Sequence, residues 1–355
     1  MTRPFASVLI DTYNHEKFIE QAIVSVLEQD FPEADREIIV VDDGSTDRTP
    51  EIVAKFAPQV RLLRKKNGGQ ASAFNGGIPE CRGDIIAFLD GDDWWASSKL
   101  TLVVQAMVAD PSVGIVGHGI VNSFPNGTRL IDAPEKAERL RLTSLEAARV
   151  FRLRRSYLGT SRMTLRARIA RRILPVPDAL AFEADEYIFT LAAVLSDLII
   201  LPGVLTHYRQ HGANLYNMAG GSARGLRQKQ RVLASLAESL RGQLPARGMP
   251  ADAVECVCEI IEAEAEQIRL MLDGGAPWET LRVENAIYRI CHGDPTAAQR
   301  AFRAATMIPA ALLPPRWFYC GRRWLASRPW YRKMRAGVLT VPRMTRVAGP
   351  EEFKA

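Results

Sequence analysis

The chain has 355 residues, of which 47% are hydrophobic and 24% charged, values typical of globular proteins and not of disordered chains. The first apolar run is broken by Asp11 and is too short and polar for a signal peptide. No stretch approaches the roughly 18 apolar residues of a membrane span. We therefore expect a cytoplasmic protein. The five cysteines lack zinc-site spacing, and the net charge of +6 is concentrated at residues 295–350, which hold 11 Arg and Lys and no acid.

Strand and helix patterns alternate through the first 120 residues. Continuous Val, Ile and Leu runs predict strands at 5–11, 37–43, 60–65, 84–90 and 113–119. Amphipathic or helix-like segments lie between them at 16–29, 49–57, 71–80 and 99–110. This alternation predicts an α/β fold with a doubly wound, mostly parallel sheet of the Rossmann-like type, covered by helices on both faces.

The pattern loosens after residue 120. Helices are expected at 143–152 and 184–196, a strand leading into a helix at 162–175, and two short strands within 197–212. A Gly-rich break at 217–225 is followed by strongly helical patterns. We therefore expect a boundary near residue 220, with a helical extension at 221–306 and a basic aromatic tail at 307–355.

The fourth predicted strand ends in "IIAFLDGDDWW", which places Asp90, Asp92 and Asp93 within four positions. Ionised carboxylates repel one another, and more strongly where solvent is excluded. A divalent cation relieves this repulsion, because Mg²⁺ and Mn²⁺ prefer hard oxygen ligands and a bound diphosphate completes the coordination shell. The motif therefore favours a metal and diphosphate site; the alternative is that the acids cap the next helix or solvate a loop.

Two further polar clusters follow strand ends. "IIVVDDGSTD" presents Asp42 and Asp43, which suit a base imide or a ribose hydroxyl, although Ser45 or Asp47 also suits the N-terminal cap of the next helix. "NGGQASAFNGG" has glycines that let the backbone approach a ligand closely, but it is not the G-x-G-x-x-G dinucleotide fingerprint. Since these clusters follow the carboxyl ends of strands, we expect them to converge on one crevice.

Taken in order, "SVLIDTYN", "IIVVDDGSTD", "NGGQASAFNGG" and "IIAFLDGDDWW" resemble the nucleotide-sugar-binding half of the family 2 inverting glycosyltransferases, which have the GT-A fold. The resemblance is close from Ser7 to about Leu100. It implies a hexosyltransferase-type enzyme that takes a nucleoside diphosphate sugar, commonly UDP-linked, and uses Mn²⁺ or Mg²⁺. It also implies a catalytic domain at 1–220, with its nucleotide-sugar half at 1–118 and its acceptor half at 119–220.

The resemblance assigns roles to individual residues. Asp92 would bind the metal that bridges the diphosphate, and Asp90 would face the ribose or the metal. The other donor-binding residues that it implies are Asp11, Thr12, Tyr13 and Asn14 around the base, Asp42 and Asp43 on the nucleoside, Asn67 and Gly69 in the loop lining the pocket, and Arg209 and His211 in the "YRQH" stretch closing over the diphosphate.

The segment "LAFEADEYIFTLAA" supplies acids at a helix start. Inverting transfer requires a carboxylate to deprotonate the acceptor hydroxyl, although acids also suit the positive end of a helix dipole. The resemblance aligns the family's base with Asp185, with Glu186 and Glu183 in reserve. An acceptor that is a polyprenyl phosphate is already anionic and needs little base, so this acceptor remains an alternative.

Residues 308–335 interleave Trp, Phe and Tyr with Arg and Lys and contain no acid. This composition suits an anionic bilayer surface, at the inner face of the cell membrane and near a glycan or lipid-linked acceptor of bacterial-type cell-surface polysaccharide synthesis. The alternative is that the basic aromatic tail packs on the expected catalytic domain, with its arginines in solvent. No nucleic-acid partner is expected, because the front half offers no supporting motif. A non-catalytic nucleotide-sugar-binding module and a dinucleotide oxidoreductase are the rival classes.

Overall fold

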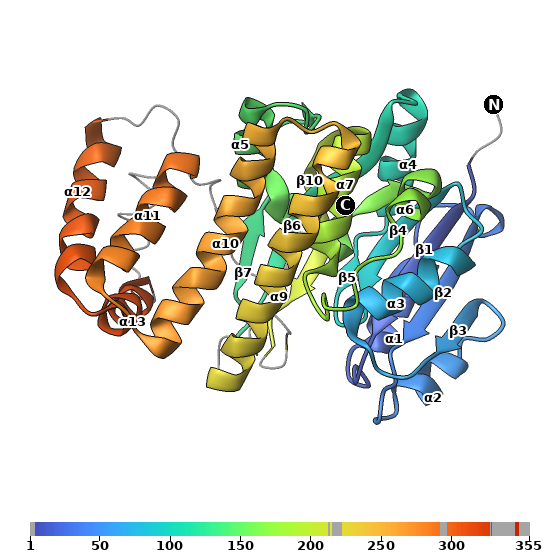
Figure 1. Ribbon diagram of the computed structural model, residues 1–355. Helices are drawn as coiled ribbons and strands as arrows, with labels where there is room; N and C mark the ends of the chain where they lie inside the picture. Colours follow the sequence, from blue (N-terminus) through green and yellow to red (C-terminus); the bar gives the residue numbers. More distant parts are fainter. Residues whose placement is uncertain are drawn as a thin grey trace.

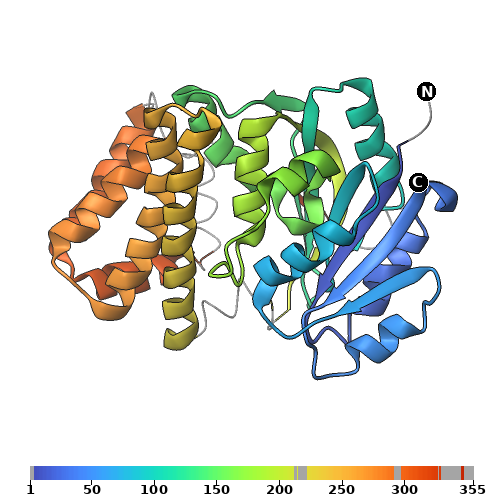
Figure 2. The same ribbon diagram turned by 45° about the vertical axis from the view of Figure 1, so that its right-hand side comes forward.

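The computed structural model describes residues 4–211, 214, 222–291, 297–326, 328 and 345–347. Strands and helices alternate through its first part (Figures 1 and 2). The strands are β1 (Ala6–Thr12), β2 (Arg36–Asp42), β3 (Val60–Arg64), β4 (Ile85–Asp90), β5 (Trp94–Trp95) and β6 (Val113–Ser123). The helices between them are α1 (Ile19–Leu27), α2 (Thr49–Ala54), α3 (Gly69–Gly77) and α4 (Lys99–Ala109). Every strand and helix predicted before residue 120 is present.

The central strands form the predicted parallel sheet. β1 pairs in parallel with both β2 and β4, and β3 continues the parallel set beyond β2. The register places Asp11 opposite Asp90 and Thr12 opposite Asp42, so three strand ends meet at one edge. β6 does not adjoin β4, because the short strand β9 (Thr164–Arg166) lies between them and is antiparallel to both.

β10 (Asp197–Arg209) replaces the two short strands that the sequence indicated. It runs parallel to β6, with register shifts between Leu201 and Val204 and between Val204 and Thr206. Pro202 has no N–H to give to the ladder and Gly203 has a φ of +89°, so the interruption forms a bulge inside one strand. The far end of β10 pairs with β5, and this pairing brings Arg209 beside the end of β4.

The remaining strands complete the sheet, and three more helices pack with them. The remaining elements are β7 (Arg129–Asp132), β8 (Glu138–Leu140), β11 (Thr345–Val347), α5 (Leu145–Arg154), α6 (Ala167–Ile173) and α7 (Ala184–Leu195). β7 is antiparallel to β6, and β11 pairs with β7 at the edge of the sheet. The helices expected at 143–152 and 184–196 correspond to α5 and α7.

Buried apolar side chains cover both faces of the sheet. Val8 and Ile10 point to the face packed by α1 and α4, whereas Leu9 points to the face packed by α3 and α7. This alternation follows from the two-residue period of a strand. Because both faces are buried, the sheet can offer polar groups to a ligand only at its edges and strand ends.

Among the described residues, five α-helices follow residue 221: α9 (Ala223–Gln243), α10 (Ala251–Asp273), α11 (Pro277–Cys291), α12 (Ala297–Leu312) and α13 (Pro315–Ala326). They lie on the side of the molecule away from β1 and β2 (Figure 1). Leu236 of α9 and Ile261 of α10 belong to the same hydrophobic cluster as Leu191 of α7, whereas α11–α13 share a smaller one. The boundary near residue 220 stays a prediction. Among the described residues, no helix is long and apolar enough to cross a membrane.

Candidate active site

The carboxyl ends of β1 and β4 bring several acids to one edge of the sheet. Asp11 is opposite Asp90 in the parallel register, and Asp92 and Asp93 follow directly in the loop after β4. Burial is the main cause that raises the pKa of Asp11 to about 8, and the charge of Asp92 adds to it. The acids predicted to converge therefore lie close enough to act on one another.

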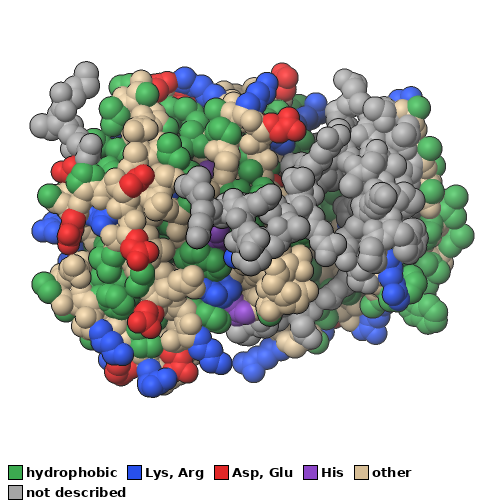
Figure 3. Space-filling view, turned by 180° about the vertical axis from the view of Figure 1, so that it is seen from behind, with side chains coloured by type: hydrophobic (Ala, Val, Ile, Leu, Met, Phe, Trp, Pro, Cys, Tyr) green, Lys and Arg blue, Asp and Glu red, His purple; other side chains and the backbone are tan. Residues whose placement is uncertain are grey.

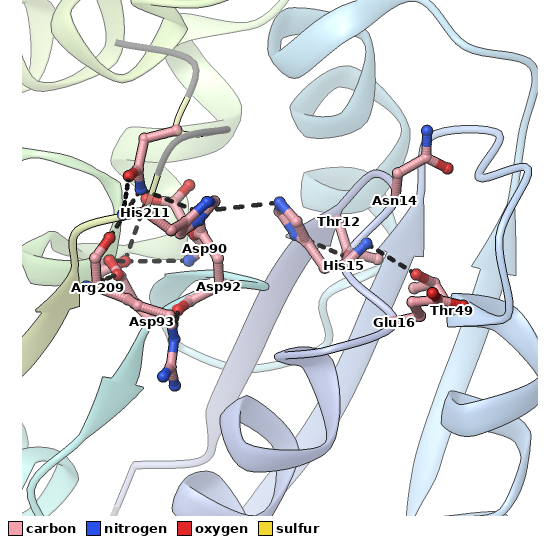
Figure 4. A network of polar contacts seen from close by, with 12 residues as sticks. Thr12, Asn14, His15, Glu16, Thr49, Asp90, Asp92, Asp93, Arg209 and His211 are labelled. Atoms are coloured by element: carbon pink, nitrogen blue, oxygen red, sulfur yellow. Dashed lines mark hydrogen bonds and ion pairs between the residues drawn. The ribbon is translucent and has the colours of Figure 1, made fainter. Parts of the chain in front are cut away.

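Asp92 is held by two residues from beyond β10 (Figure 4). Its Oδ2 atom lies 2.9 Å from Nε2 of His211 and 3.3 Å from Nδ2 of Asn214. Nε2 of His15, from the loop after β1, is 3.9 Å from the same oxygen. Burial by itself would raise the pKa of Asp92, but the His211 hydrogen bond and the charges of both histidines outweigh it and lower the pKa.

Ser161 connects the other two acids of the motif. Its hydroxyl lies 2.6 Å from Oδ2 of Asp93 and 3.1 Å from Oδ2 of Asp90. The backbone N–H of Arg209 donates to Oδ1 of Asp93 at 2.9 Å, and the buried Lys99 donates to the Ser161 carbonyl at 2.8 Å. Burial, with the charges of neighbouring acids, raises the pKa of Asp90 and of Asp93 well above the usual value. Asp93 thus has protein partners on both oxygens.

The acids after β2 organise the loops around them. Oδ1 of Asp43 accepts from Nζ of Lys65 at 2.6 Å, and Oδ2 accepts from the N–H of Gly69 at 2.7 Å. Oδ1 of Asp42 accepts from the N–H of Ser45 at 3.0 Å. Both acids therefore shape the β2 loop and the loop before α3.

The remaining residues predicted around the donor differ in exposure. Tyr13 is 43% exposed, and Asn67 is also exposed, in the loop before α3. Asn14 has a φ of +57°, and its side-chain oxygen accepts from the N–H of Thr46 at 2.8 Å. Thr12 is buried, with Oγ1 at 3.1 Å from Nδ1 of His15. These residues line the strand ends beside the acids.

Arg209 and Asp185 approach the acids from other elements. The Arg209 guanidinium lies 4.5 Å from the ring centroid of Trp94, and its Nε donates to the Asp92 carbonyl at 2.9 Å. Asp185, in the first turn of α7, accepts from the N–H of Thr160 at 3.0 Å. Burial raises the pKa of Asp185, and its charge in turn acts on Asp11 and Asp90.

Glu186 and Glu183, the alternative candidates for the base, lie in different surroundings from Asp185. Glu186 is buried in ion pairs with Arg152 and Arg155, whose charges outweigh the effect of burial and lower its pKa. Glu183 is the N-cap of α7 and has a φ of +60°. Burial raises the pKa of Glu183 to about 8, and Nζ of Lys229 lies 4.0 Å from its Oε1.

Sequence reasoning missed the residues that fix the acids in place. Ser161 contacts two of these acids, and Thr160, His15 and Asn214 each contact one, yet a single polar residue in a loop carries no motif. His15 alone had a signal, because it directly follows the "DTYN" cluster. The other three come next to the acids only through the antiparallel β9 segment and the end of β10.

The donor set fits a hard divalent cation that takes few protein ligands. Among the residues described, no group of three His, Cys, Asp or Glu side chains is arranged to hold a metal by itself. Mg²⁺ and Mn²⁺ sites, however, often need only one or two carboxylates and complete their shell with phosphate oxygens and water. Oδ1 of Asp11 is buried without a hydrogen-bond partner among the described residues, and it faces an acid-rich edge that a cation would stabilise.

Comparison with known proteins identifies the family. Residues 7–168 match the family described as Glycosyl transferase family 2. The chain is 31% identical over 227 residues to an uncharacterized glycosyltransferase, alr2836, of Nostoc sp. strain PCC 7120, and the match covers 61% of this chain and 68% of that one. The protein belongs to glycosyltransferase family 2. As a family 2 glycosyltransferase it is a transferase, and the resemblance of its four motifs is confirmed.

Solved structures confirm the fold expected for family 2. The mannosyltransferase PcManGT from Pyrobaculum calidifontis, in complex with GDP-Man and Mn²⁺, has a TM-score of 0.53 at 20% identity, covering 95% of this chain and 84% of that one. TarS 1–349 from S. aureus, in complex with UDP-GlcNAc, has a TM-score of 0.54 at 19% identity, covering 86% and 87%. At these identities the likeness shows the GT-A-type fold and leaves the substrates open.

Proposed function

We propose that this family 2 enzyme is an inverting, divalent-metal-dependent glycosyltransferase. Its donor is a nucleoside diphosphate sugar, with a UDP-sugar favoured, and its acceptor is a glycan or lipid-linked hydroxyl in bacterial-type cell-surface polysaccharide synthesis. The observation that supports the proposal is that Asp185 accepts from the N–H of Thr160, the neighbour of Ser161, whose hydroxyl contacts Asp90 and Asp93; the candidate base therefore lies near the strand-end acids. A base on one side and metal-binding acids on the other are the two requirements of in-line displacement.

Asp92 and His211 are the residues that would hold the cation, Mn²⁺ or Mg²⁺. When bound, the cation neutralises the diphosphate and so stabilises the departing nucleoside diphosphate. PcManGT binds Mn²⁺ together with GDP-Man in its solved complex, which supports metal use in a protein of this fold. Arg209, fixed over Trp94, adds a positive charge at the same end of the site.

Asp185 is assigned the proton transfer. The acceptor oxygen forms a bond to the anomeric carbon as the bond from that carbon to the phosphate oxygen breaks, and the acceptor proton passes to the Asp185 carboxylate. Its hydrogen bond from the Thr160 N–H fixes the carboxylate, and burial makes it a stronger base than an exposed Asp. One displacement from the face opposite the leaving group inverts the anomeric configuration.

The nucleoside is assigned to the ends of β1 and β2. Asp11, Thr12, Tyr13 and Asn14 would surround the base, and Asp42 and Asp43 the nucleoside. Asn67 and Gly69 would line the opposite wall, since the Gly69 N–H already binds Asp43. UDP-GlcNAc in a TarS structure and GDP-Man in the PcManGT structure, both of the same fold, support a nucleoside diphosphate sugar as the donor. The reaction is placed in the cytoplasm, with a peripheral contact at the inner membrane face.

A screen of nucleotide sugars with Mn²⁺, followed by NMR of the product anomer, tests the proposal. Metal-dependent release of nucleoside diphosphate, with inversion in the glycosylated product, is the expected result. Retention of configuration would contradict the mechanism, and donor binding without turnover on any acceptor would favour a non-catalytic binding module. If Asp185→Asn keeps its activity on a polyprenyl phosphate, the acceptor is that phosphate and the base assignment is wrong.

A further inference from the structure

The turn between α12 and α13 exposes large hydrophobic side chains that the transfer site does not use. Ile308, Leu312 and Trp317 have 62%, 73% and 73% of their surface exposed, and Leu313 and Trp324 have 38% and 57%. We call these five residues the α12–α13 surface. Side chains of this kind are usually buried, and a group of them on the surface marks an interaction site.

Helix α13 presents two different faces. Phe318 and Tyr319 are buried in the small cluster with Ala310 of α12, and Arg322 forms an ion pair with Glu284 of α11 at 2.5 Å. Trp317 and Trp324 are seven residues apart and therefore share the outer face. The inner face anchors α13 to its neighbours, so the helix holds its outer tryptophans in solvent at a fixed position.

Positive charge accompanies this hydrophobic surface. Arg316 is exposed at the start of α13, and the guanidinium of Arg328 lies 4.2 Å from the ring centroid of Trp324. The sequence from 295 to 350 holds 11 Arg and Lys and no acid. From behind the molecule, hydrophobic side chains gather along the edge of the helical region, next to Lys and Arg (Figure 3).

We propose that the α12–α13 surface docks the protein on an anionic lipid bilayer. Trp317 and Trp324 would lie at the headgroups, where amphipathic rings are favoured, and Ile308, Leu312 and Leu313 would enter the outer acyl region. Arg316 and Arg328 would pair with lipid phosphates. Aliphatic side chains at the tip of the turn fit acyl chains better than nucleic acid. The inference rests on the membrane contact of the proposed function and names the surface that makes it, but it does not depend on the transfer chemistry.

Vesicle co-sedimentation of the full chain tests this contact. Binding is expected to vesicles containing phosphatidylglycerol, to be much weaker with phosphatidylcholine alone, and to fall as salt rises. Leu312→Ala/Trp317→Ala should weaken binding by about tenfold or more, because burial of both side chains is lost. The matched control is Leu102→Ala/Val108→Ala, which removes exposed apolar surface from α4 and should leave binding unchanged.

A probe on Cys320 shows whether this surface itself meets lipid. Cys320 lies between the two tryptophans and is exposed, whereas Cys81, Cys256 and Cys258 are buried. In a Cys291→Ser background, an environment-sensitive fluorophore on Cys320 should shift to the blue with anionic vesicles. No shift on vesicle binding, or equal loss of binding in the α4 control, would overturn the proposal. Concentration-dependent dimerisation that Leu312→Ala/Trp317→Ala abolishes would also overturn it, because the surface would then belong to an interface with a second copy of the chain.

Discussion

Nε2 of His211 lies 2.9 Å from Oδ2 of Asp92, although 119 residues separate the two in the chain. β10 makes this contact, because its pairing with β6 and β5 carries the chain back to the end of β4. The pair joins the strand-end acids of the first part of the sheet to the segment that follows β10. A nitrogen and a carboxylate oxygen this close suit two ligands of one cation.

Substitution of this pair should remove metal dependence. Asp92→Asn is expected to lower the affinity for UDP in the presence of Mn²⁺ by about 100-fold, and His211→Ala by about tenfold or more. Isothermal titration with and without Mn²⁺ measures both effects. Nucleotide binding without metal should change little, since neither side chain is assigned to the base. Unaltered metal dependence in Asp92→Asn would show that another group binds the cation.

Unlike Asp92, Asp93 is expected to stabilise the fold and not to bind the metal. Asp93→Ala leaves the Arg209 N–H without its acceptor and the Ser161 hydroxyl with Asp90 alone, and it removes an acid that offsets the buried Lys99. A loss of about 1–3 kcal/mol in the free energy of unfolding follows from the unsatisfied groups. Denaturant unfolding should show it. Folded Asp93→Ala that loses metal-dependent nucleotide affinity as severely as Asp92→Asn would place Asp93 among the ligands.

The sequence was sufficient for the strand ends of the first part of the sheet. Strong hydrophobic periods located β1, β2 and β4, and the parallel arrangement that they predict brings Asp11 opposite Asp90. The site forms there because backbone register alone sets which residues are neighbours. The hydrophobic periodicity of the sequence was therefore enough to predict which residues are neighbours at these strand ends.

The other side of the site depends on contacts that no local pattern encodes. β9 is only three residues long and enters between β4 and β6, and with it comes Ser161. β10 was expected as two strands because Pro202 and Gly203 interrupt its pattern, yet pairing with β6 continues across the bulge. Pairing with β6 therefore outweighed the interrupted local pattern of β10, the strand that leads to His211.

The base assignment has a pH signature. Transfer needs Asp185 ionised, and burial raises its pKa above the ordinary 3.8, with Glu186 raising it further and Arg162 lowering it. Asp11 and Asp90 also act on this carboxylate through space. Activity should therefore fall, as the pH decreases, at a higher pH than an exposed Asp would give. The acidic limb of kcat/KM against pH measures this.

Substitution separates the base from its neighbour in the chain. Asp185→Asn should lower kcat by about 10²–10⁴-fold while the affinity for the donor is kept. Glu183→Gln should keep both the rate and the acidic limb, because Glu183 is the N-cap residue of α7 beside Lys229 and is not the assigned base. If the limb moves in Glu183→Gln and stays in Asp185→Asn, the assignment is reversed.

The loop before α3 offers a glycine pair for comparison. Gly69 has a φ of +81°, and a Cβ there would lie 2.6 Å from the Cα of Ala181, so Gly69→Ala should displace the N–H that binds Asp43. We expect weaker nucleotide binding and a loss of about 1–2 kcal/mol from the backbone conformation alone. Gly76→Ala, in the same helix, meets only the end of Lys65 at 3.7 Å. It should be neutral or stabilise α3 by up to about 1 kcal/mol.

Arg155 links the helical region to α7, the helix that carries Asp185. Its guanidinium pairs with Glu186 of α7 and with Glu264 of α10, both at 2.5 Å. Arg155→Met leaves the buried Glu186 with Arg152 alone, so we expect a loss of about 2–4 kcal/mol in the free energy of unfolding. Because Glu186 adjoins Asp185, kcat should fall while the KM for the donor is unchanged.

Glu264→Gln, at a more exposed position, should cost about 1 kcal/mol or less and leave kcat intact. An equal effect of the two variants on kcat would mean that α10, and not the Glu186 pair, positions the base.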